Sequence, residues 1–236
     1  MTLVTNMQSS LFNTEARKTL VFGGSFNPIH RGHLAAARFA RDSIGFDHVI
    51  FLPCGDNYGK RGLIHHEHRL AMLYLAIRDE PGFEVEEVEA RSDVRMRNVE
   101  TLREIRAARP DDLLVLFRGL DALNRTHRRL FNDPGLQILV LDRADSKARF
   151  EQILLKKPHL NVNRDRIWYA QGAFSHPASS TKIRHAVLTG GEARDLVPGA
   201  VADYIQDKGL YLKGNEHEQL RSKRTSRSCG TSSSNS

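Results

Sequence analysis

A glycine-rich turn near the start of the chain joins a short apolar run to a segment of good helix formers. The apolar run, residues 19–22, predicts a buried strand, and residues 34–41 predict a helix because alanine, leucine and arginine dominate them. The two glycines that open the turn, residues 23–33, let a ligand approach the backbone without meeting a Cβ. Free N–H groups and the dipole at a helix start favour an anion. With His30 and His33 at the same place, the turn predicts a cradle for a polyphosphate.

Apolar runs alternate with helical patterns along the rest of the chain. Further strands are predicted at residues 48–53, 83–88, 112–117, 137–141 and 166–170. Further helices are predicted at residues 66–77, 98–109 and 197–205, with one more that starts at Ser179 or Ser180 and stops at Gly190. Such alternation predicts an α/β fold: a Rossmann-like, doubly wound and mostly parallel sheet in a single domain.

Ligands of such sheets bind at the carboxyl ends of the strands. The loops at residues 23–33, 54–63 and 119–121 each follow a predicted strand, so we expect them to converge on one cleft. The start of the helix at Ser179 or Ser180 gathers hydroxyl groups, N–H groups and two cations, Lys182 and Arg184. The same physics predicts a second anion site there.

Composition limits the class of protein and the extent of the folded part. No apolar run approaches the roughly 20 residues of a membrane helix, the first residues lack a signal-peptide pattern, and Cys54 and Cys229 imply no disulfide framework. A cytoplasmic location without membrane contact is therefore expected. Of the net charge of +7, residues 213–236 contribute five Lys/Arg and two Glu, or +3. The remaining +4 gives no reason to expect nucleic-acid binding.

The domain boundaries follow from the same patterns. We expect a flexible extension at residues 1–18, one folded domain at residues 19–212, and a disordered, basic, serine-rich tail at residues 213–236. The sequence leaves the oligomeric state open, a homo-oligomer included.

Two motifs resemble those of the nucleotidyltransferase superfamily. The first is its signature G-x-F-x-P-x-H-x-G-H, whose defined positions are filled by Gly24, Phe26, Pro28, His30, Gly32 and His33. Six defined positions after a predicted strand are far more specific than a lone pair of histidines. The second, residues 179–184, resembles the S-S-T-x-I-R element, which in that superfamily binds the triphosphate end of the nucleotide.

Most of the chain, residues 19–212, resembles the bacterial nicotinate mononucleotide adenylyltransferases. Segments at residues 67–73, 100–102, 119–123 and 196–205 fit the order and spacing of that family. The resemblance implies transfer of the adenylyl group of ATP to nicotinate mononucleotide, by direct in-line attack on the α-phosphate. The products are deamido-NAD and pyrophosphate, a step of NAD biosynthesis. It also implies Mg²⁺ bound mainly through the ATP phosphates, and the sequence offers no protein ligand for a metal.

The resemblance also assigns the site. His30 and His33 are the expected catalytic residues and act as hydrogen-bond donors to the α-phosphate. The expected ATP-binding residues are Gly23, Gly24, Ser25, Phe26, Ser179, Ser180, Thr181, Lys182 and Arg184. The expected acceptor-binding residues are Lys60, Asn98, Gly119, Asp121, Arg125 and Arg129.

The departures from the family pattern all fall on the acceptor side. Arg97 and Asn98 stand where the family has a Tyr-Thr pair, and Thr126 and Arg129 match its Trp-x-x-Trp positions. The family's Pro-x-His-Lys is absent, which leaves Lys60 as the nearest basic residue. Two alternatives therefore stay open: an adenylyl- or cytidylyltransferase with another phosphorylated acceptor, and a nucleotide-binding protein without turnover.

The histidine-rich run at residues 65–68 suggests a metal site at first sight. The zinc-protease pattern H-E-x-x-H, however, would need histidine at position 70, where Leu70 stands. The favoured interpretation of this run is a solvated helix start.

Overall fold

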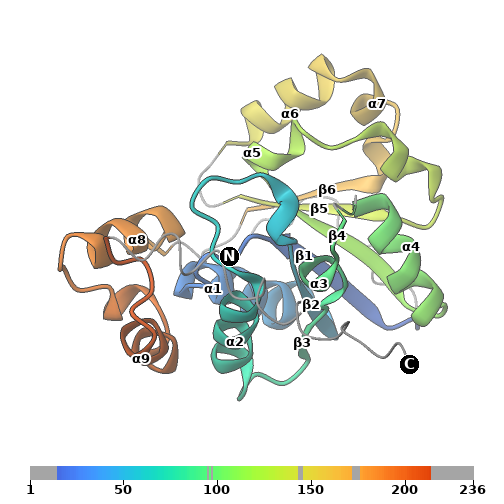
Figure 1. The fold of residues 1–236 in the computed structure, drawn as a ribbon. Coiled ribbons are helices and arrows are strands. Elements are labelled where there is room, and N and C mark those ends of the chain that lie inside the picture. Colours follow the sequence, from blue (N-terminus) through green and yellow to red (C-terminus); the bar gives the residue numbers. More distant parts are fainter. Residues whose placement is uncertain (1–14, 95, 97, 143–145, 172–175, 214–236) are drawn as a thin grey trace, which may run out of the picture.

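Six strands form one sheet in the order β3-β2-β1-β4-β5-β6 (Figure 1). The computed structural model describes residues 15–94, 96, 98–142, 146–171 and 176–213. The strands are β1 (Lys18–Gly24), β2 (His48–Pro53), β3 (Phe83–Val85), β4 (Leu113–Gly119), β5 (Gln137–Asp142) and β6 (Ile167–Gln171). Every pair of neighbours is parallel. The six predicted strands are confirmed, and the sheet is wholly parallel across the described residues.

Helices connect the strands. They are α1 (Arg31–Phe39), α2 (His66–Ile77), α3 (Val88–Arg91), α4 (Asn98–Ala108), α5 (Leu120–Leu123), α6 (Lys147–Lys156), α7 (Pro158–Asn161), α8 (Ser180–Leu188) and α9 (Gly199–Asp207). Ser179 is the N-cap of α8, and Gly190 adopts a φ of 72° just beyond the helix, as predicted for a helix stop. The predicted strand at residues 83–88 ends early, because Val88 turns into α3 and packs on the opposite face of the sheet from Phe83.

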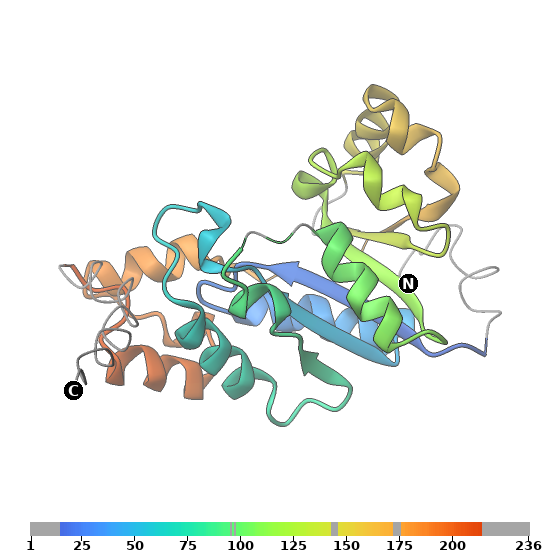
Figure 2. The same cartoon turned by 45° about the vertical axis from the view of Figure 1, so that its right-hand side comes forward.

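Side chains alternate between two hydrophobic cores, one on each face of the sheet. In β1, Leu20 and Phe22 enter the core that α1, α2 and α9 cover, whereas Val21 enters the core under α4, α6 and α7. Figure 2 shows α6 and α7 (yellow) above the sheet and α2 (teal) below it. Burial on both faces explains why the strands read as continuous apolar runs.

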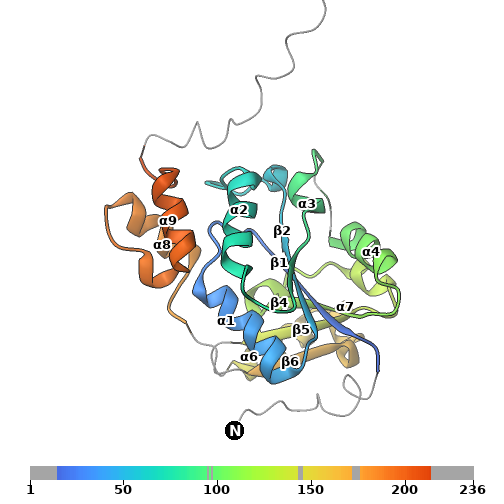
Figure 3. The same cartoon turned by 90° about the horizontal axis from the view of Figure 1, so that it is seen from below.

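The strand order places a crevice beside β1. The chain runs outward from β1 to β2 and β3, then returns to β4 on the other side of β1 and continues to β6. Loops that follow β1 and β4 therefore diverge at the carboxyl edge of the sheet, where ligands of doubly wound folds bind. The helices α8 and α9 lie beside α1 and α2 (Figure 3), and Ile183, Val201 and Ile205 join that side's core.

The folded part begins slightly earlier than expected. Lys18 already belongs to β1, and Arg17 forms an ion pair with Asp112 at 3.2 Å, so residues 17 and 18 are held by the sheet. Residues 1–14 of the expected N-terminal extension, and the tail from residue 214 onward, lie outside the described residues. In the described part of the chain, no helix has the length and apolar character needed to cross a membrane.

Candidate active site

His30 and His33 form a reciprocal cap at the start of α1. His30 is the N-cap residue, and its Nδ1 accepts a hydrogen bond from the backbone N–H of His33 at 3.3 Å. The Nδ1 of His33 in turn accepts the backbone N–H of His30 at 3.3 Å. The two rings stack, with centroids 3.6 Å apart and an angle of 19° between their planes. Histidine thus does here what Ser and Glu do in an ordinary capping box.

The cap fixes the tautomer of both rings. A neutral imidazole carries one proton, and Nδ1 accepts in each ring, so the proton lies on Nε2. Nε2–H is then the hydrogen-bond donor of each ring. His30 is 3% exposed, which holds its ring in a single orientation. Two parallel, oriented donors at a helix N-terminus suit an anion whose charge develops during a reaction.

Gly24 and Phe26 give the signature loop (residues 23–33) its shape. A Cβ on Gly24 would lie 2.8 Å from Cζ of Phe26, so only glycine leaves room for that ring. The Phe26 ring is 1% exposed and packs edge-on against His33 at 5.1 Å between centroids. Phe26 was expected to bind ATP, and its side chain lies in the core, where it supports the ring of His33.

Gly32 lies between the His30 ring and the backbone of Ala178, which precedes the second motif. A Cβ there would lie 3.1 Å from Nδ1 of His30 and 3.4 Å from the carbonyl oxygen of Ala178. We expect Gly32→Ala to displace the His30 ring and to lower turnover by about 10-fold or more, since misplacing a catalytic group by ~1 Å can cost 10²-fold.

Gly199 offers the control for Gly32. It also lies in the first turn of a helix, and nothing lies within 4 Å of an added Cβ. Gly199→Ala should leave turnover unchanged and the melting temperature equal or higher. Equal turnover in the two variants, measured as pyrophosphate release, would show that the contact with His30 does not matter.

The second motif (residues 179–184) docks on the signature loop. The Ser180 hydroxyl donates to the carbonyl oxygen of Pro28 at 2.9 Å, and Arg184 donates from Nη1 to that of Asn27 at 2.7 Å. Ser179 caps α8 by accepting the backbone N–H of Lys182 at 3.2 Å. The N-termini of α1 and α8 are thereby held against one loop. Thr181 and Lys182 remain exposed there, where an anionic ligand can reach them.

Asn27 joins three segments of the chain by hydrogen bonds, a role that the sequence analysis did not predict. Its side chain is 5% exposed, donates to the carbonyl oxygen of Gly62 at 2.6 Å and accepts from the hydroxyl of Tyr211 at 3.0 Å. It thus links the signature loop to the Lys60 loop (residues 54–63) and to the segment after α9. It occupies a variable position of the signature, so no motif singled it out.

A buried arginine fastens the Lys60 loop. The side chain of Arg69 is 0% exposed and donates to the carbonyl oxygens of Ile64 and Ser25, at 3.0 and 3.1 Å, and to Oδ1 of Asp56 at 2.9 Å. Burial raises the pKa of Asp56, but hydrogen bonds with His66 and Arg69 outweigh it and hold that pKa below its ordinary value. Lys60 donates to Oγ of Ser25 at 2.7 Å, so the convergence predicted for these two loops is observed.

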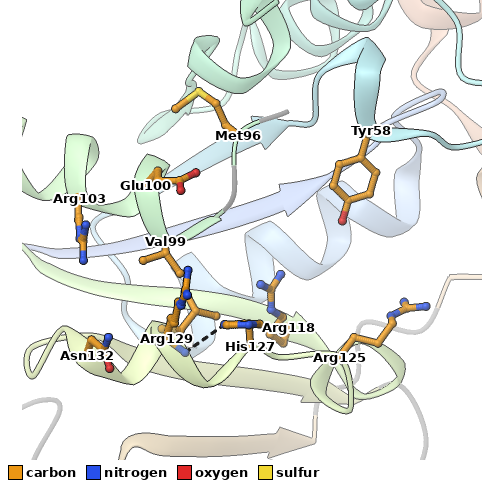
Figure 4. A pocket seen from close by; sticks show the side chains of 11 residues that line it. Tyr58, Met96, Val99, Glu100, Arg103, Arg118, Arg125, His127, Arg129 and Asn132 are labelled. Carbon is orange, nitrogen blue, oxygen red and sulfur yellow. Dashed lines mark hydrogen bonds between the residues drawn. The ribbon is translucent and has the colours of Figure 1, made fainter. Parts of the chain in front are cut away.

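Two adjoining cavities open beside these loops. The loop cavity, about 460 Å³, is lined by Gly23, Gly24, Ser25, Lys60 and Glu89 among others. The arginine cavity, about 410 Å³, contains Arg103, Arg129 and His127 (Figure 4). Both cavities are lined by Tyr58, Arg118 and Arg125, so a ligand can extend from one into the other.

Charge in the arginine cavity is strongly positive. Among the described residues, four arginines and His127 line it, and Glu100 supplies the one carboxylate. In Figure 4, Tyr58 and Glu100 lie across the hollow from His127 and Arg129. Burial lowers the pKa of the Arg118 guanidinium from its ordinary value, and Glu89 beside it acts in the opposite direction. The cavity suits a ligand with more than one negative charge.

The remaining expected acceptor residues are placed differently. The side chain of Asp121 is 82% exposed and forms an ion pair with Arg149 of α6 at 2.6 Å. Neither Asp121 nor Gly119 lines either of the two cavities. An acidic side chain on the outside of α5 does not face a ligand in either cavity. Asn98 begins α4, but its side chain lies outside the described residues, as does Arg97.

Sequence reasoning missed Arg118, Tyr58 and Arg103 as cavity residues. Arg118 had a usable signal, because it stands at the carboxyl end of β4, next to the point where the strand order reverses. Tyr58 and Arg103 carry no comparable signal, since a loop and a helix face bring them to the cavity only in three dimensions.

Known proteins match this chain over most of its length. A family model described as cytidylyltransferase-like matches residues 21–186. A relative from Dehalococcoides mccartyi that carries the name nicotinate-nucleotide adenylyltransferase is 33% identical over 208 residues, covering 83% of this chain and 98% of its own. The chain belongs to the nicotinate-nucleotide adenylyltransferase family. Another member with that name, from Symbiobacterium thermophilum, is 34% identical over 207 residues, covering 85% of this chain and 98% of its own.

Solved structures show that the fold is that of the family. The nicotinic acid mononucleotide adenylyltransferase of Plasmodium falciparum, solved as a complex with NaAD, superposes with a TM-score of 0.63 at 18% identity. The match covers 83% of this chain and 97% of the other. At this level of identity the likeness establishes the α/β nucleotidyltransferase architecture.

Proposed function

We propose that the protein transfers the adenylyl group of ATP to nicotinate mononucleotide, and so makes deamido-NAD and pyrophosphate. A phosphate oxygen of the acceptor attacks the α-phosphorus of ATP in line, and the bond to the β-phosphate oxygen breaks. No protein nucleophile is needed, so catalysis consists of positioning and charge stabilisation. The carrying observation, in a member of this family, is that the loop cavity is lined by Gly23, Gly24 and Ser25 of the signature loop and shares three residues with the arginine cavity.

The proposed ATP site is supported by the N-termini of α1 and α8. His30 and His33 would donate from Nε2 to the α-phosphate and the bridging oxygen, where negative charge grows as pyrophosphate departs. Thr181, Lys182 and the N-terminus of α8 would hold the β- and γ-phosphates. Ser180 and Arg184 bind carbonyl oxygens of the signature loop, so their role is to keep the two halves together.

The proposed acceptor site is supported by the cationic side chains of the two cavities and by the residues that the cavities share. Nicotinate mononucleotide carries a phosphate at one end and a ring carboxylate at the other, and both need cationic or N–H partners. Arg118, Arg125 and Lys60 line the part of the cavities next to the signature loop, where the attacking phosphate must lie. Arg129 lines the arginine cavity, where the pyridine ring would lie. A guanidinium plane can stack on that ring in place of the family's tryptophan and can attract its carboxylate.

Mg²⁺ fits this site as a companion of the nucleotide. Within the described residues, the only group of three side chains spaced to hold a metal ion is Asp56, His65 and His66, and His30 and His33 are not part of it. The residues around the phosphates are donors and cations, so the ion would be held by phosphate oxygens and water. When bound, it neutralises phosphate charge. The cytoplasm, where both substrates occur, is the proposed place of action.

The test compares nicotinate and nicotinamide mononucleotides as acceptors, in the wild type and in Arg129→Ala. We expect kcat/KM to favour the acid by about 10- to 100-fold in the wild type, because an amide would leave its NH₂ facing donors unpaired. Arg129→Ala should lose most of this preference. The measurement is the steady-state rate of pyrophosphate release with each acceptor.

Arg128 supplies a matched control, since it neighbours Arg129 but lines neither cavity. Arg128→Ala should keep the acid preference. Equal use of acid and amide by the wild type would defeat the proposed substrate. Binding of ATP without turnover of either acceptor would favour the second candidate, transfer to another phosphorylated acceptor, for which the excess of arginines is also suited.

A further inference from the structure

Three metal-ligating side chains meet where the Lys60 loop turns into α2. They are Asp56, at the start of a short 3₁₀ turn (Asp56–Tyr58), His65, the N-cap residue of α2, and His66, its first residue. Oδ2 of Asp56 lies 2.8 Å from Nδ1 of His66 and 3.4 Å from Nε2 of His65. The three ligand atoms lie within 4.8 Å of one another.

We propose that Asp56, His65 and His66 form a binding site for one divalent cation of the zinc class. Two imidazoles and one carboxylate are ligands for Zn²⁺ and similar transition metals, whereas Mg²⁺ prefers oxygen alone. The site is separate from the nucleotide's own Mg²⁺ and does not depend on the proposed reaction. The H-E-x-x-H pattern failed to predict it because the third ligand comes from the preceding loop.

The spacing of the ligand atoms suits such an ion. Zinc–nitrogen and zinc–oxygen bonds of about 2.0–2.1 Å in a tetrahedron place the ligand atoms about 3.3–3.4 Å apart. The distance from Oδ2 of Asp56 to Nε2 of His65 already has this value, and the distance to Nδ1 of His66 would lengthen by about 0.5 Å. The side chains of His65 and His66 are 13% and 17% exposed, and that of Asp56 is 36% exposed, so water can reach the remaining position.

Neighbouring groups orient two of the three ligands. The buried Arg69 holds the other carboxylate oxygen of Asp56 at 2.9 Å, which turns Oδ2 toward the histidines. Nδ1 of His65 lies 3.8 Å from Oε2 of Glu67. In the cap of α2, Nδ1 of His65 accepts the backbone N–H of Glu67 at 3.4 Å. A metal on Nε2 would move the ring proton to Nδ1, so this cap bond would be exchanged for a hydrogen bond to the Glu67 carboxylate, an arrangement typical of metal-binding histidines. His68, one turn away, instead bonds the hydroxyl of Tyr204 at 3.0 Å.

The ion would tie the first turn of the Lys60 loop to the start of α2. Tyr58 and Lys60 lie between these two anchors, and both line the loop cavity. Arg69 bonds both Asp56 and the backbone of Ser25, so the metal site and the signature loop share one support. A bound ion should therefore order the loop and raise the melting temperature.

The experiment titrates Zn²⁺ into the untagged, chelator-treated full chain in competition with a chromophoric chelator. We expect one tight site per chain in the wild type, weakened by about 100-fold or more in His66→Ala and in Asp56→Asn. Asp56→Asn keeps an oxygen for Arg69, so it remains informative if His66→Ala fails to fold. Co²⁺ should give the visible absorption of a tetrahedral site in the wild type, and a tenfold excess of Mg²⁺ should not displace it.

The chain has 11 histidines, so the control must separate this cluster from weak surface binding. His48 is matched, since its Nδ1 contacts Oε1 of Glu84 at 2.7 Å, a histidine–carboxylate pair without a third ligand. His48→Ala should keep the tight site. Equal Zn²⁺ affinity in the wild type and in both site variants would overturn the proposal, as would an equal loss in His48→Ala.

Discussion

Replacing His33 with asparagine should lower the turnover of adenylyl transfer by about 10²–10³-fold, the usual cost of removing one oriented donor. The asparagine oxygen can still accept the backbone N–H of His30, as Nδ1 of His33 does at 3.3 Å, so the cap at the start of α1 survives. The Nε2–H donor is lost, together with the stacking on His30 and the ring contact with Phe26. Turnover is measured as pyrophosphate release at saturating ATP and acceptor, and stability by urea unfolding.

The matched control is His185→Asn, an exposed histidine on α8, which should change neither quantity. Turnover of His33→Asn within tenfold of the wild type would show that this donor is not used in the transition state. A higher KM for ATP with unchanged turnover would mean that His33 binds the ground state equally well.

Replacing Arg69 with leucine should lower the free energy of unfolding by about 3–5 kcal/mol. Leucine fills part of the volume, but it leaves the carbonyl oxygens of Ile64 and Ser25 and the carboxylate of Asp56 without their donor. Unpaired buried acceptors carry most of this cost. Urea unfolding at neutral pH measures the effect.

Arg78, which ends the same helix, provides the comparison. Its ion pair with Asp79 is long, at 3.7 Å, and its side chain is 68% exposed, so Arg78→Leu should change stability by no more than about 0.5 kcal/mol. Similar losses in the two variants would mean that the three hydrogen bonds of Arg69 do not hold the Lys60 loop.

The strands were predictable because a parallel sheet covered on both faces leaves a continuous apolar run in the sequence. β2 (His48–Pro53) and α2 (His66–Ile77) match the predicted ranges to the residue. By contrast, α6 (Lys147–Lys156) was not predicted, since only Phe150 and Leu154 are buried and the helix carries little apolar periodicity. The signature loop was predictable because its glycines and histidines are tied to local backbone geometry.

The acceptor side was harder to predict for a physical reason. Arg118, Arg125 and Arg129 come from β4 and from two separate turns after it, so only the folded sheet brings them to one hollow. The same holds for the cluster around Asp56, whose partners lie nine and ten residues further along the chain. Conversely, Asp121 was expected at the cleft, but it sits on the outer side of α5 because the helix turns it toward Arg149.

The bonds that join the second motif to the signature loop span 152 and 157 residues. During synthesis, a chain that has just completed β6 (Ile167–Gln171) contains all six strands of the described sheet but only the signature-loop side of the proposed triphosphate site. A fragment released at that stage lacks Ile183, Val201 and Ile205 of the core on the α1 and α2 side. It also lacks Thr181, Lys182 and the start of α8, which are proposed to hold the phosphates of ATP. The proposed ATP site is therefore complete only after α8 has been synthesised.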